Sequence, residues 1–364
     1  MEVLLVFGYF RTSNAGMTSS STPPEKPKRR VRYSGKNPRK FNEKYKELNP
    51  EKYAQEIEKI KSRGATPAGT HRSICVDEIL NILNPQPGET ALDATLGYGG
   101  HTSFIIPRVQ PHGRVIGMDQ DPIERQKTEA RLKNSGIPEG SFILAPFNFS
   151  AAKEFLVENK IFKVDMILAD LGLSSMQIDD PSRGFSLKFD VPLDLRMNPH
   201  TGITAAELLA NLSVNDLAQM LRENSDEQRA EVIAKALILK RPQTTFELAD
   251  AIREVISGFS KKVQLEEGEK PIRRAVQALR ISVNEEFKVL DQFLKDIPSM
   301  LNPGGRVAIL SFHSGEDRRV KKSFQGFERD KIYSRVAQEF IRPSMEEQRR
   351  NTRSKSAKLR WALL

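Results

Sequence analysis

The sequence is poor in the residues and segments that would tie it to an oxidising compartment or to a membrane. Cys75 is the only cysteine among 364 residues, which excludes an internal disulfide framework and any metal site built from several cysteines. No apolar run approaches the ~20 residues that a membrane helix needs. The short apolar segment 3–10 lacks the preceding basic residue of a signal peptide. These absences predict a cytoplasmic protein with no membrane-bound part and no metal site.

Positive charge is in excess and is unevenly placed. The chain holds 57 Lys and Arg against 47 Asp and Glu, a formal charge of +10. Residues 21–50 hold ten Lys or Arg against three Glu, and residues 341–364 hold seven against two. These stretches carry +7 and +5, so the rest of the chain is close to neutral. Basic terminal arms indicate contact with a polyanion, although a solvated tail explains them equally well.

From residue 76 onward, short apolar runs alternate with helical periodicity. Residues 76–83 predict a helix, and five apolar runs predict buried strands at 90–97, 114–119, 141–147, 164–172 and 306–313. Residues 356–364 predict a closing strand after a basic loop. Strands that alternate with helices indicate a parallel sheet with helices on both faces. We therefore expect an α/β fold with a Rossmann-like, mostly parallel sheet.

The domain organisation follows from composition and spacing. More than 130 residues separate the fourth predicted strand from the fifth, far more than one crossover helix needs. Their helical periodicity predicts a helical subdomain inserted into the sheet domain. We expect a basic, largely disordered arm with a short helix (1–65), a first part of the sheet domain (66–195), the helical insert (196–290), and a completion of the sheet domain with a basic C-terminal segment (291–364).

The first predicted strand ends in a glycine loop, DATLGYGGH, at residues 93–101. Gly97, Gly99 and Gly100 allow the backbone to turn tightly and to approach a ligand closely. Asp119, at the end of the second strand, is suited to accept hydrogen bonds from both ribose hydroxyls of an adenosine. A dinucleotide loop needs a third glycine, in the pattern GxGxxG, and that glycine is missing here. The loop therefore favours S-adenosylmethionine over a nicotinamide dinucleotide, and a structural turn without a ligand stays open.

A second polar segment, DLGLSSMQ at residues 170–177, follows the fourth strand and therefore lies at the same sheet edge. Asp170 faces either the cofactor or a substrate amine. Ser174 and Gln177 supply short polar groups that orient a planar base. A carboxylate at a strand end is also a common turn former, so Asp170 by itself does not establish a site.

Long motifs in a fixed order make the chain similar to one known family. They are DATLGYGGH (93–101), DLGLSSMQID (170–179), RGFS (183–186), PLDLRMNP (192–199), VQALRISVNEE (276–286), GGRVAILSFHSGEDR (304–318) and SAKLRWA (356–362). They resemble the bacterial ribosomal RNA small subunit methyltransferase H family, which methylates N4 of a cytidine in 16S rRNA. One departure is Gly315, where most members have leucine.

The resemblance implies a class I S-adenosylmethionine-dependent methyltransferase fold with an inserted helical domain. The implied cofactor contacts are Gly99, Gly100, His101, Asp119, Phe149, Asp170 and Gln177. We add Gly97, which belongs to the same glycine loop as Gly99 and Gly100. Core packing is the alternative role of Phe149. The implied partner is 16S ribosomal RNA in the small ribosomal subunit, and the protein is expected to be a monomer or a homodimer.

The exocyclic amine of cytosine is a poor nucleophile, because its lone pair is delocalised into the ring. A carboxylate that accepts a hydrogen bond from the amine stabilises the charge that builds on nitrogen. Asp170 is the first candidate, and Ser174, Asp194 and His313 complete the predicted catalytic set. Asp194 forms a structural ion pair with Arg196 in the alternative interpretation. His313 is equally well explained as a structural histidine.

Arginine and phenylalanine side chains stack on bases, and cations contact phosphates. The residues predicted to bind RNA are Arg183, Phe185, Arg196, Arg349, Arg353, Lys355 and Arg360. Two other functions stay open. One is a catalytically silent RNA-binding or ribosome-assembly factor on a methyltransferase scaffold. The other is a methyltransferase for another nucleic acid. DNA enzymes of that kind usually carry Asn/Asp-Pro-Pro-aromatic after the fourth strand, where this chain has DLGLSS.

Overall fold

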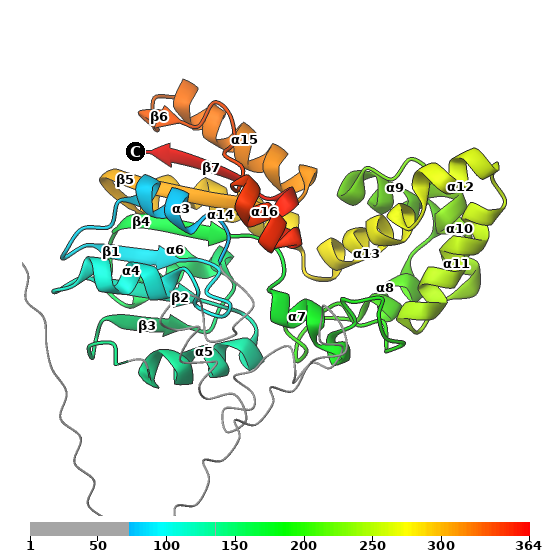
Figure 1. The fold of residues 1–364 in the computed structure, drawn as a ribbon, viewed down its shortest axis with the longest axis horizontal. Coiled ribbons are helices and arrows are strands. Elements are labelled where there is room, and N and C mark those ends of the chain that lie inside the picture. The colour runs from blue at the N-terminus through cyan, green and yellow to red at the C-terminus, as the bar shows by residue number, and fades with distance from the viewer. Residues whose placement is uncertain (1–72, 135) are drawn as a thin grey trace, which may run out of the picture. The chain divides into compact units, whose positions relative to one another are not determined.

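A seven-stranded sheet in the order β3-β2-β1-β4-β5-β7-β6 is the centre of the computed structural model, which describes residues 73–134 and 136–364 (Figure 1). The strands are β1 Thr90–Asp93, β2 Arg114–Met118, β3 Phe142–Ala145, β4 Val164–Asp170, β5 Leu301–Ser311, β6 Arg335–Val336 and β7 Lys358–Leu363. The first five strands are parallel, and β7 is antiparallel to both of its neighbours. The Rossmann-like, mostly parallel sheet is therefore confirmed.

The strands follow the apolar runs, with three main differences. β1 ends at Asp93 rather than at residue 97, because the chain turns into the glycine loop there. β5 begins at Leu301 rather than at residue 306, because Val164 pairs with Leu301 and Met166 with Arg306 in an irregular register. β6 is not among the predicted strands, since two residues carry no periodic signal. The predicted N-terminal arm and its short helix lie outside the described residues.

Both faces of the sheet are buried, as a parallel sheet requires. Along β4, Met166 and Leu168 join the core on one face, while Ile167 and Ala169 join the core on the other. Helices α3 (Val76–Leu83) and α4 (Thr102–Val109) pack on the first face. The second face packs against α6 (Ala152–Glu158), α14 (Glu286–Met300) and α15 (Ser314–Arg329).

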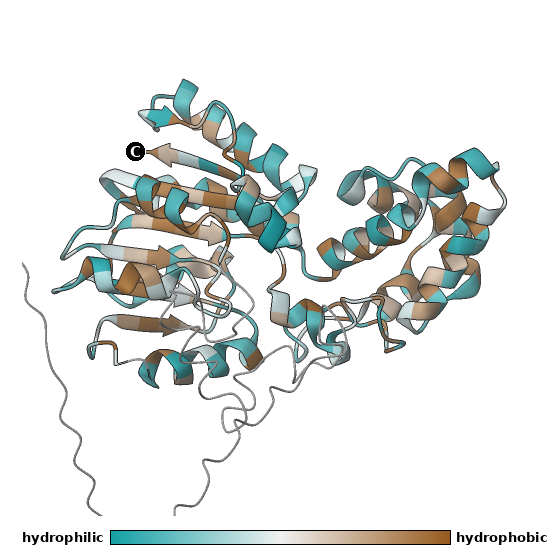
Figure 2. Ribbon diagram, in the orientation of Figure 1, coloured by the Kyte–Doolittle hydropathy of each residue, from teal (hydrophilic) through white to brown (hydrophobic). Residues whose placement is uncertain are grey.

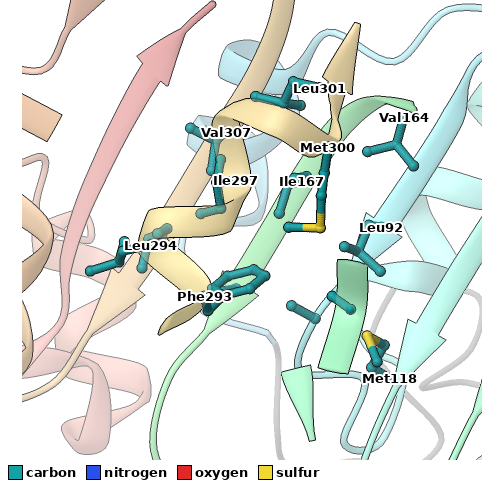
Figure 3. Packing of buried hydrophobic residues seen from close by; sticks show 14 of the residues in the cluster. Leu92, Met118, Val164, Ile167, Phe293, Leu294, Ile297, Met300, Leu301 and Val307 are labelled. Carbon is teal, nitrogen blue, oxygen red and sulfur yellow. The ribbon is translucent and has the colours of Figure 1, made fainter. Parts of the chain in front are cut away.

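Helix α14 supplies the largest apolar surface of the second core. Phe293, Leu294, Ile297 and Met300 recur at helical spacing and lie over Ile167 of β4 (Figure 3). Burial of such side chains stabilises the fold by about 1.5–3 kcal/mol each. The chain that returns from the helical subdomain is thereby anchored directly beside the strand that carries Asp170.

The helical subdomain has a hydrophobic core of its own. Its helices are α8 Ala205–Asn211, α9 Val214–Ser225, α10 Ala230–Lys240, α11 Thr245–Ser257, α12 Lys261–Glu267 and α13 Lys270–Val283. They show apolar and hydrophilic residues side by side, as helices with one buried side do (Figure 2). The core of this subdomain extends upstream of residue 196, where the insert is predicted to begin, because it includes Phe185, Leu193 and Leu195. Helix α14 belongs to the core of the sheet instead.

The remaining elements are short or lie beside the sheet. They are α5 Pro122–Asn134, α7 Ser175–Asp179, α16 Met345–Arg350 and three 3₁₀ turns, η2 Phe149–Ala151, η3 Pro181–Arg183 and η4 Thr352–Ser356. A side-chain oxygen caps the amino end of each of these turns and of α7 and α16. No helix within the described ranges is long and apolar enough to cross a bilayer.

Candidate active site

A cavity of about 710 Å³ lies where the carboxyl ends of β1, β2 and β4 meet. The segments after these strands form one side of it, and α13, α14, the start of α15 and η4 form the other. The predicted residues that line it are Gly97, Gly100, His101, Asp119, Phe149, Asp170, Ser174, Gln177, His313, Arg353 and Lys355. Those that do not line it are Gly99, Arg183, Phe185, Asp194, Arg196, Arg349 and Arg360.

The glycine loop is held by hydrogen bonds to side chains of two other segments. Gly97 and Gly99 have φ of 47° and 68°. The Gly97 amide donates to Asp119 Oδ2 at 2.8 Å, and its carbonyl accepts from the Thr128 hydroxyl at 2.6 Å. A Cβ on Gly99 would lie 2.8 Å from the Arg131 guanidinium. Gly99 therefore shapes the loop by its packing against α5.

Asp93, the last residue of β1, supports the loop from behind. Its carboxylate accepts hydrogen bonds from the Thr102 hydroxyl at 2.6 Å and from the Thr95 amide at 3.2 Å. Burial raises the pKa of Asp93 above its ordinary value, against the lowering effect of these bonds. The side chain joins the strand end to the first turn of α4 and does not line the cavity.

Asp119 follows β2, and two backbone amides orient its carboxylate toward the cavity. Oδ2 accepts from Gly97 at 2.8 Å and Oδ1 accepts from Asp121 at 2.8 Å. Burial raises the pKa of Asp119 to about 7, and the charge of Asp121 adds to the rise, while the two amide bonds oppose it. Each carboxylate oxygen has a further lone pair for a hydroxyl donor.

We expect binding of an adenosyl ligand to tighten as the pH rises. With a pKa of about 7, Asp119 is mostly protonated at pH 6 and mostly ionised at pH 8. Protonation removes one acceptor, so affinity falls by up to ~tenfold from pH 8 to pH 6. Calorimetry with S-adenosylhomocysteine at three pH values measures this change. Asp119→Asn is the control, because its affinity changes with pH only through the other ionisable groups. Identical pH profiles for the two proteins would contradict the prediction.

Asp170 ends β4 and lies beside His101. Its backbone amide donates to the Thr95 hydroxyl at 2.6 Å, which fixes the end of the strand. Asp170 Oδ2 lies 3.6 Å from His101 Nε2. Within the described residues, Asp170 Oδ1 and His101 Nε2 are buried atoms without a hydrogen-bond partner. Buried polar atoms are rarely left unpaired in native proteins, so these two indicate where a ligand completes the bonding.

Helix α7 is fixed to the Asp119 segment through Gln177. Ser174 and Gln177 form a capping box at the amino end of the helix. Gln177 Oε1 accepts from the Ser174 amide at 2.9 Å, and Nε2 donates to Asp121 Oδ2 at 2.7 Å. The amide of Gln177 is therefore occupied within the protein. Gln177 lines the cavity, but its polar atoms hold the wall in place.

Arg183 and Phe185, predicted to bind RNA, lie in the interior instead. Arg183 is 5% exposed and donates to Asp121 at 2.8 Å and to the carbonyl oxygens of Arg196 and Met197. Phe185 is 9% exposed and belongs to the helical core. These two predictions are corrected. The Arg183 guanidinium binds the buried carboxylate of Asp121, which is distant in the sequence, and the Phe185 ring packs in the hydrophobic core of the helical subdomain.

Asp194 and Arg196 form an ion pair with each other. Arg196 Nε and Nη2 donate to the two carboxylate oxygens at 2.7 Å and 2.8 Å. Burial by itself would raise the pKa of Asp194, but the bonds from Arg196 outweigh it and lower that pKa below its ordinary value. The pair does not line the cavity. The structure therefore favours the ion-pair interpretation over a catalytic Asp194.

The C-terminal cations divide into structural and accessible groups. Arg360 is 4% exposed and donates to Asp317 at 2.6 Å, so it is not available to a phosphate. Arg353 pairs with Asp179 of α7 at 2.9 Å and closes one wall of the cavity. Lys355 is exposed and lines the cavity mouth, and Arg349 is exposed outside it.

Besides His313, the far wall of the cavity contains residues to which the sequence analysis assigned no role. Arg280 of α13 makes two hydrogen bonds, of 2.7 Å and 2.9 Å, to the carboxylate of Glu286. His313 Nε2 lies 3.2 Å from Glu316 Oε1. Burial would raise the pKa of Glu316, yet its contacts with His313 and the Phe312 amide lower it overall. Arg280 and Glu286 both lie in the motif VQALRISVNEE, and this was the one feature of the sequence that could have marked them as site residues.

Glu286, His313 and Glu316 offer ligand atoms within 4.8 Å of one another. Protein groups already occupy these acceptors, because Arg280 binds both oxygens of Glu286 and the Phe312 amide binds Glu316 at 2.8 Å. We therefore assign no metal to this group.

Phe149 lines the opposite side of the cavity, and its ring centroid also lies 5.0 Å from that of Phe293.

The fold has a parallel sheet with an antiparallel strand between β5 and β6, a glycine loop after β1 that lacks the third glycine of a dinucleotide site, and an acid after β2. These features together are those of a class I S-adenosylmethionine-dependent methyltransferase. Comparison with known families agrees with this class. Residues 68–363 match the MraW methylase family, and the chain belongs to that family. The predicted class, fold and cofactor are thereby confirmed.

Several curated relatives match almost the whole chain. A protein of Lachnoclostridium phytofermentans named ribosomal RNA small subunit methyltransferase H 1 is 50% identical over 354 residues, which cover 95% of this chain and 96% of the relative. A protein of Alkaliphilus metalliredigens named ribosomal RNA small subunit methyltransferase H 2 is 48% identical, with coverage of 93% and 98%. A protein of Agathobacter rectalis named ribosomal RNA small subunit methyltransferase H 1 is 49% identical, with coverage of 92% of this chain and 97% of the relative.

Proposed function

We propose that this protein transfers the methyl group of S-adenosylmethionine to the exocyclic N4 amine of a cytidine in 16S rRNA of the small ribosomal subunit. One observation carries the proposal. An unpaired carboxylate oxygen of Asp170 lies at the end of β4, in the cavity that Asp119 enters from the end of β2. The names of the relatives and the family membership supply the RNA target.

The residues at the strand ends fit the cofactor. Asp119 is oriented to accept from two hydroxyls, which are the ribose donors of an adenosyl group. Phe147 and Phe149 line the same end of the cavity and offer aromatic surface for an adenine. His101 Nε2 is a buried atom without a hydrogen-bond partner among the described residues, where the amino-acid end would lie. When bound, S-adenosylmethionine supplies a methyl group on a positively charged sulfur.

Asp170 has the position and charge to activate the acceptor. Its free oxygen accepts a hydrogen bond from the exocyclic amine and so stabilises the positive charge that develops on nitrogen. The same bond turns the nitrogen lone pair toward the cofactor side of the cavity. No strong base is needed, because the nitrogen becomes cationic on methylation and then loses a proton to water, while S-adenosylhomocysteine is the product that leaves. His313 and Ser174 line the cavity beside Asp170 and are proposed to orient the base.

A silent RNA-binding or assembly factor is the second candidate, since a fold does not guarantee activity. The glycine loop, Asp119 and Asp170 are all in place, and they would have no selective use in such a factor. A DNA substrate is disfavoured by DLGLSS after β4. Ribosomal subunits mature in the bacterial cytoplasm, which is the proposed location of the protein. Its state as a monomer or a homodimer stays a prediction.

The test of the proposal uses the full-length protein and labelled S-adenosylmethionine. Small ribosomal subunits are isolated from cells that lack the homologous activity, and the product nucleosides are separated by mass spectrometry. We expect label in N4-methylcytidine from one position of 16S rRNA and none in DNA. Label in another nucleoside would overturn the assigned acceptor, and tight cofactor binding without any transfer would favour the silent factor.

Exposed cations near the cavity mouth are expected to contact phosphates. Arg349 and Lys355 are exposed and belong to the basic C-terminal segment. Substitution of either by alanine should weaken RNA binding and reduce the slope of log K against log salt by about 1. Filter binding over a salt series measures the slope. Lys160 is an exposed control at the amino end of β4, away from the cavity, and Lys160→Ala should leave the slope unchanged. Equal slopes for all four proteins would count against phosphate contacts at these residues.

A further inference from the structure

Phe287 is an aromatic side chain in the first turn of α14 that the sheet core does not use. The buried residues of the helix, among them Leu290, Phe293 and Leu294, join the core cluster on the sheet. Phe287 belongs to none of the hydrophobic clusters of the described residues. It lines the cavity instead. An apolar ring in a cavity wall, outside every core, is more expected of a binding surface than of packing.

Polar and aromatic neighbours hold the ring in one place. The Arg319 guanidinium lies over the ring, 4.2 Å from its centroid, and also donates to Asp291 of α14. The His313 ring lies 5.8 Å away at an interplanar angle of 50°. Arg319 covers one face of the ring. A ring that is fixed before the substrate arrives offers contact area at a small cost in conformational entropy.

Gly315 provides the space in which the ring lies. A Cβ at position 315 would be 2.5 Å from Phe287 Cζ and 3.2 Å from His313 Nδ1. The residue has no positive φ, so its backbone does not require glycine. Any side chain there would displace the Phe287 ring, so Phe287 and Gly315 act as a pair.

The pair lies close to the residue that is proposed to hold the acceptor amine. Gly172, two residues after Asp170, has Phe312 and Glu316 of the α15 start as its nearest neighbours, at 3.9 Å and 4.0 Å from its ideal Cβ position. The ring centroid of His313 lies 5.8 Å from that of Phe287. Arg280 and Glu286 of this wall bind each other, and His313 Nε2 lies 3.2 Å from Glu316 Oε1 but has no hydrogen-bond partner among the described residues. The Phe287 ring is the aromatic surface of this wall that suits the apolar face of a planar base.

We infer that Phe287 is the stacking surface for the acceptor base and that Gly315 determines the position of this surface. The inference rests on the proposed function, since it takes the acceptor to be a pyrimidine of RNA. A base presses one π-face against the ring while its amine edge reaches Asp170. An aromatic side chain can stack on any of the bases, but the stacking requires a flat ring.

Phe287→Met tests the ring, because methionine keeps the apolar volume and loses the flat face. We expect kcat/KM for small ribosomal subunits to fall on the order of tenfold. The dissociation constant of S-adenosylhomocysteine and the Tm should stay at the wild-type values. Phe162, which is 82% exposed on the loop before β4, is the matched control, and Phe162→Met should keep full activity. A Phe287→Met enzyme with wild-type kcat/KM would overturn the inference.

Gly315→Ala tests the position of the ring and keeps the ring itself. It should lower kcat/KM about as much as Phe287→Met does. In the double variant, Gly315→Ala should cause no further loss, because the ring that it displaces is gone. Fully additive losses would show that Gly315 does not act through Phe287. Wild-type transfer is measured in the same assay. Its absence would overturn the proposed function, whereas wild-type transfer with an unimpaired Phe287→Met enzyme would overturn only the stacking role.

Discussion

Asp170→Asn should lower kcat for methyl transfer by about 10²–10³-fold, which is the usual effect of removing one preorganised group aimed at developing charge. The substitution keeps the shape of the side chain and removes its negative charge. The carboxylate has one oxygen near His101 and one buried oxygen without a partner among the described residues, so the second is available to the amine. The loss should appear in single-turnover rates with ribosomal subunits, where product release does not contribute.

Cofactor affinity separates this role from a purely binding role. If Asp170 acts mainly on the amine, the dissociation constant of S-adenosylhomocysteine should change far less than kcat. Asp330→Asn is the control, since Asp330 is an exposed carboxylate at the end of α15. An Asp170→Asn protein with wild-type kcat, or one whose loss lies entirely in cofactor affinity, would contradict the assignment.

Asp119→Ala should weaken cofactor binding by roughly 10²-fold or more, because two hydrogen bonds to a charged acceptor are lost at about 1.5–3 kcal/mol each. The alanine also leaves the Gly97 and Asp121 amides without the acceptor that now orients the loop. Calorimetry at pH 8, where the carboxylate is mostly ionised, gives the largest difference from the wild type.

Catalysis at saturating cofactor distinguishes binding from chemistry for Asp119. If Asp119 binds the sugar and not the acceptor, as proposed, kcat should recover much of its wild-type value once the cofactor is saturating. Asp77→Ala, at an exposed position on α3, is the control for the loss of a carboxylate. Unchanged affinity in Asp119→Ala would remove the basis for placing the adenosyl group at the end of β2.

The contrast between Asp119 and Arg183 shows how far local sequence reaches. Asp119 is predictable because a strand end in a parallel sheet has a known position, and an acid there faces the ligand edge. Arg183 is in an equally suggestive motif, RGFS, yet its partner is Asp121, 62 residues away. No local pattern reveals that pairing. The same holds for Arg360, which β7 places beside Asp317 of α15.

Phe287 and Gly315 show the same limit from the other direction. Each is unremarkable in its own helix, and 28 positions separate them in the chain. Their relation exists only because α14 and α15 pack side by side on the sheet, which brings the ring to the space that the missing side chain leaves.

The order of apolar runs, the glycine loop and the acids at strand ends determined the parallel sheet, the cofactor class and the sheet edge at which the cavity lies, because strand periodicity and backbone conformation are local properties. Packing between distant segments decided which charged side chains reach the cavity and which are consumed in ion pairs. Burying a charge without a partner costs several kcal/mol, so Arg183 and Arg360 each have a partner that is distant in the sequence, and only the assembled fold determined which one.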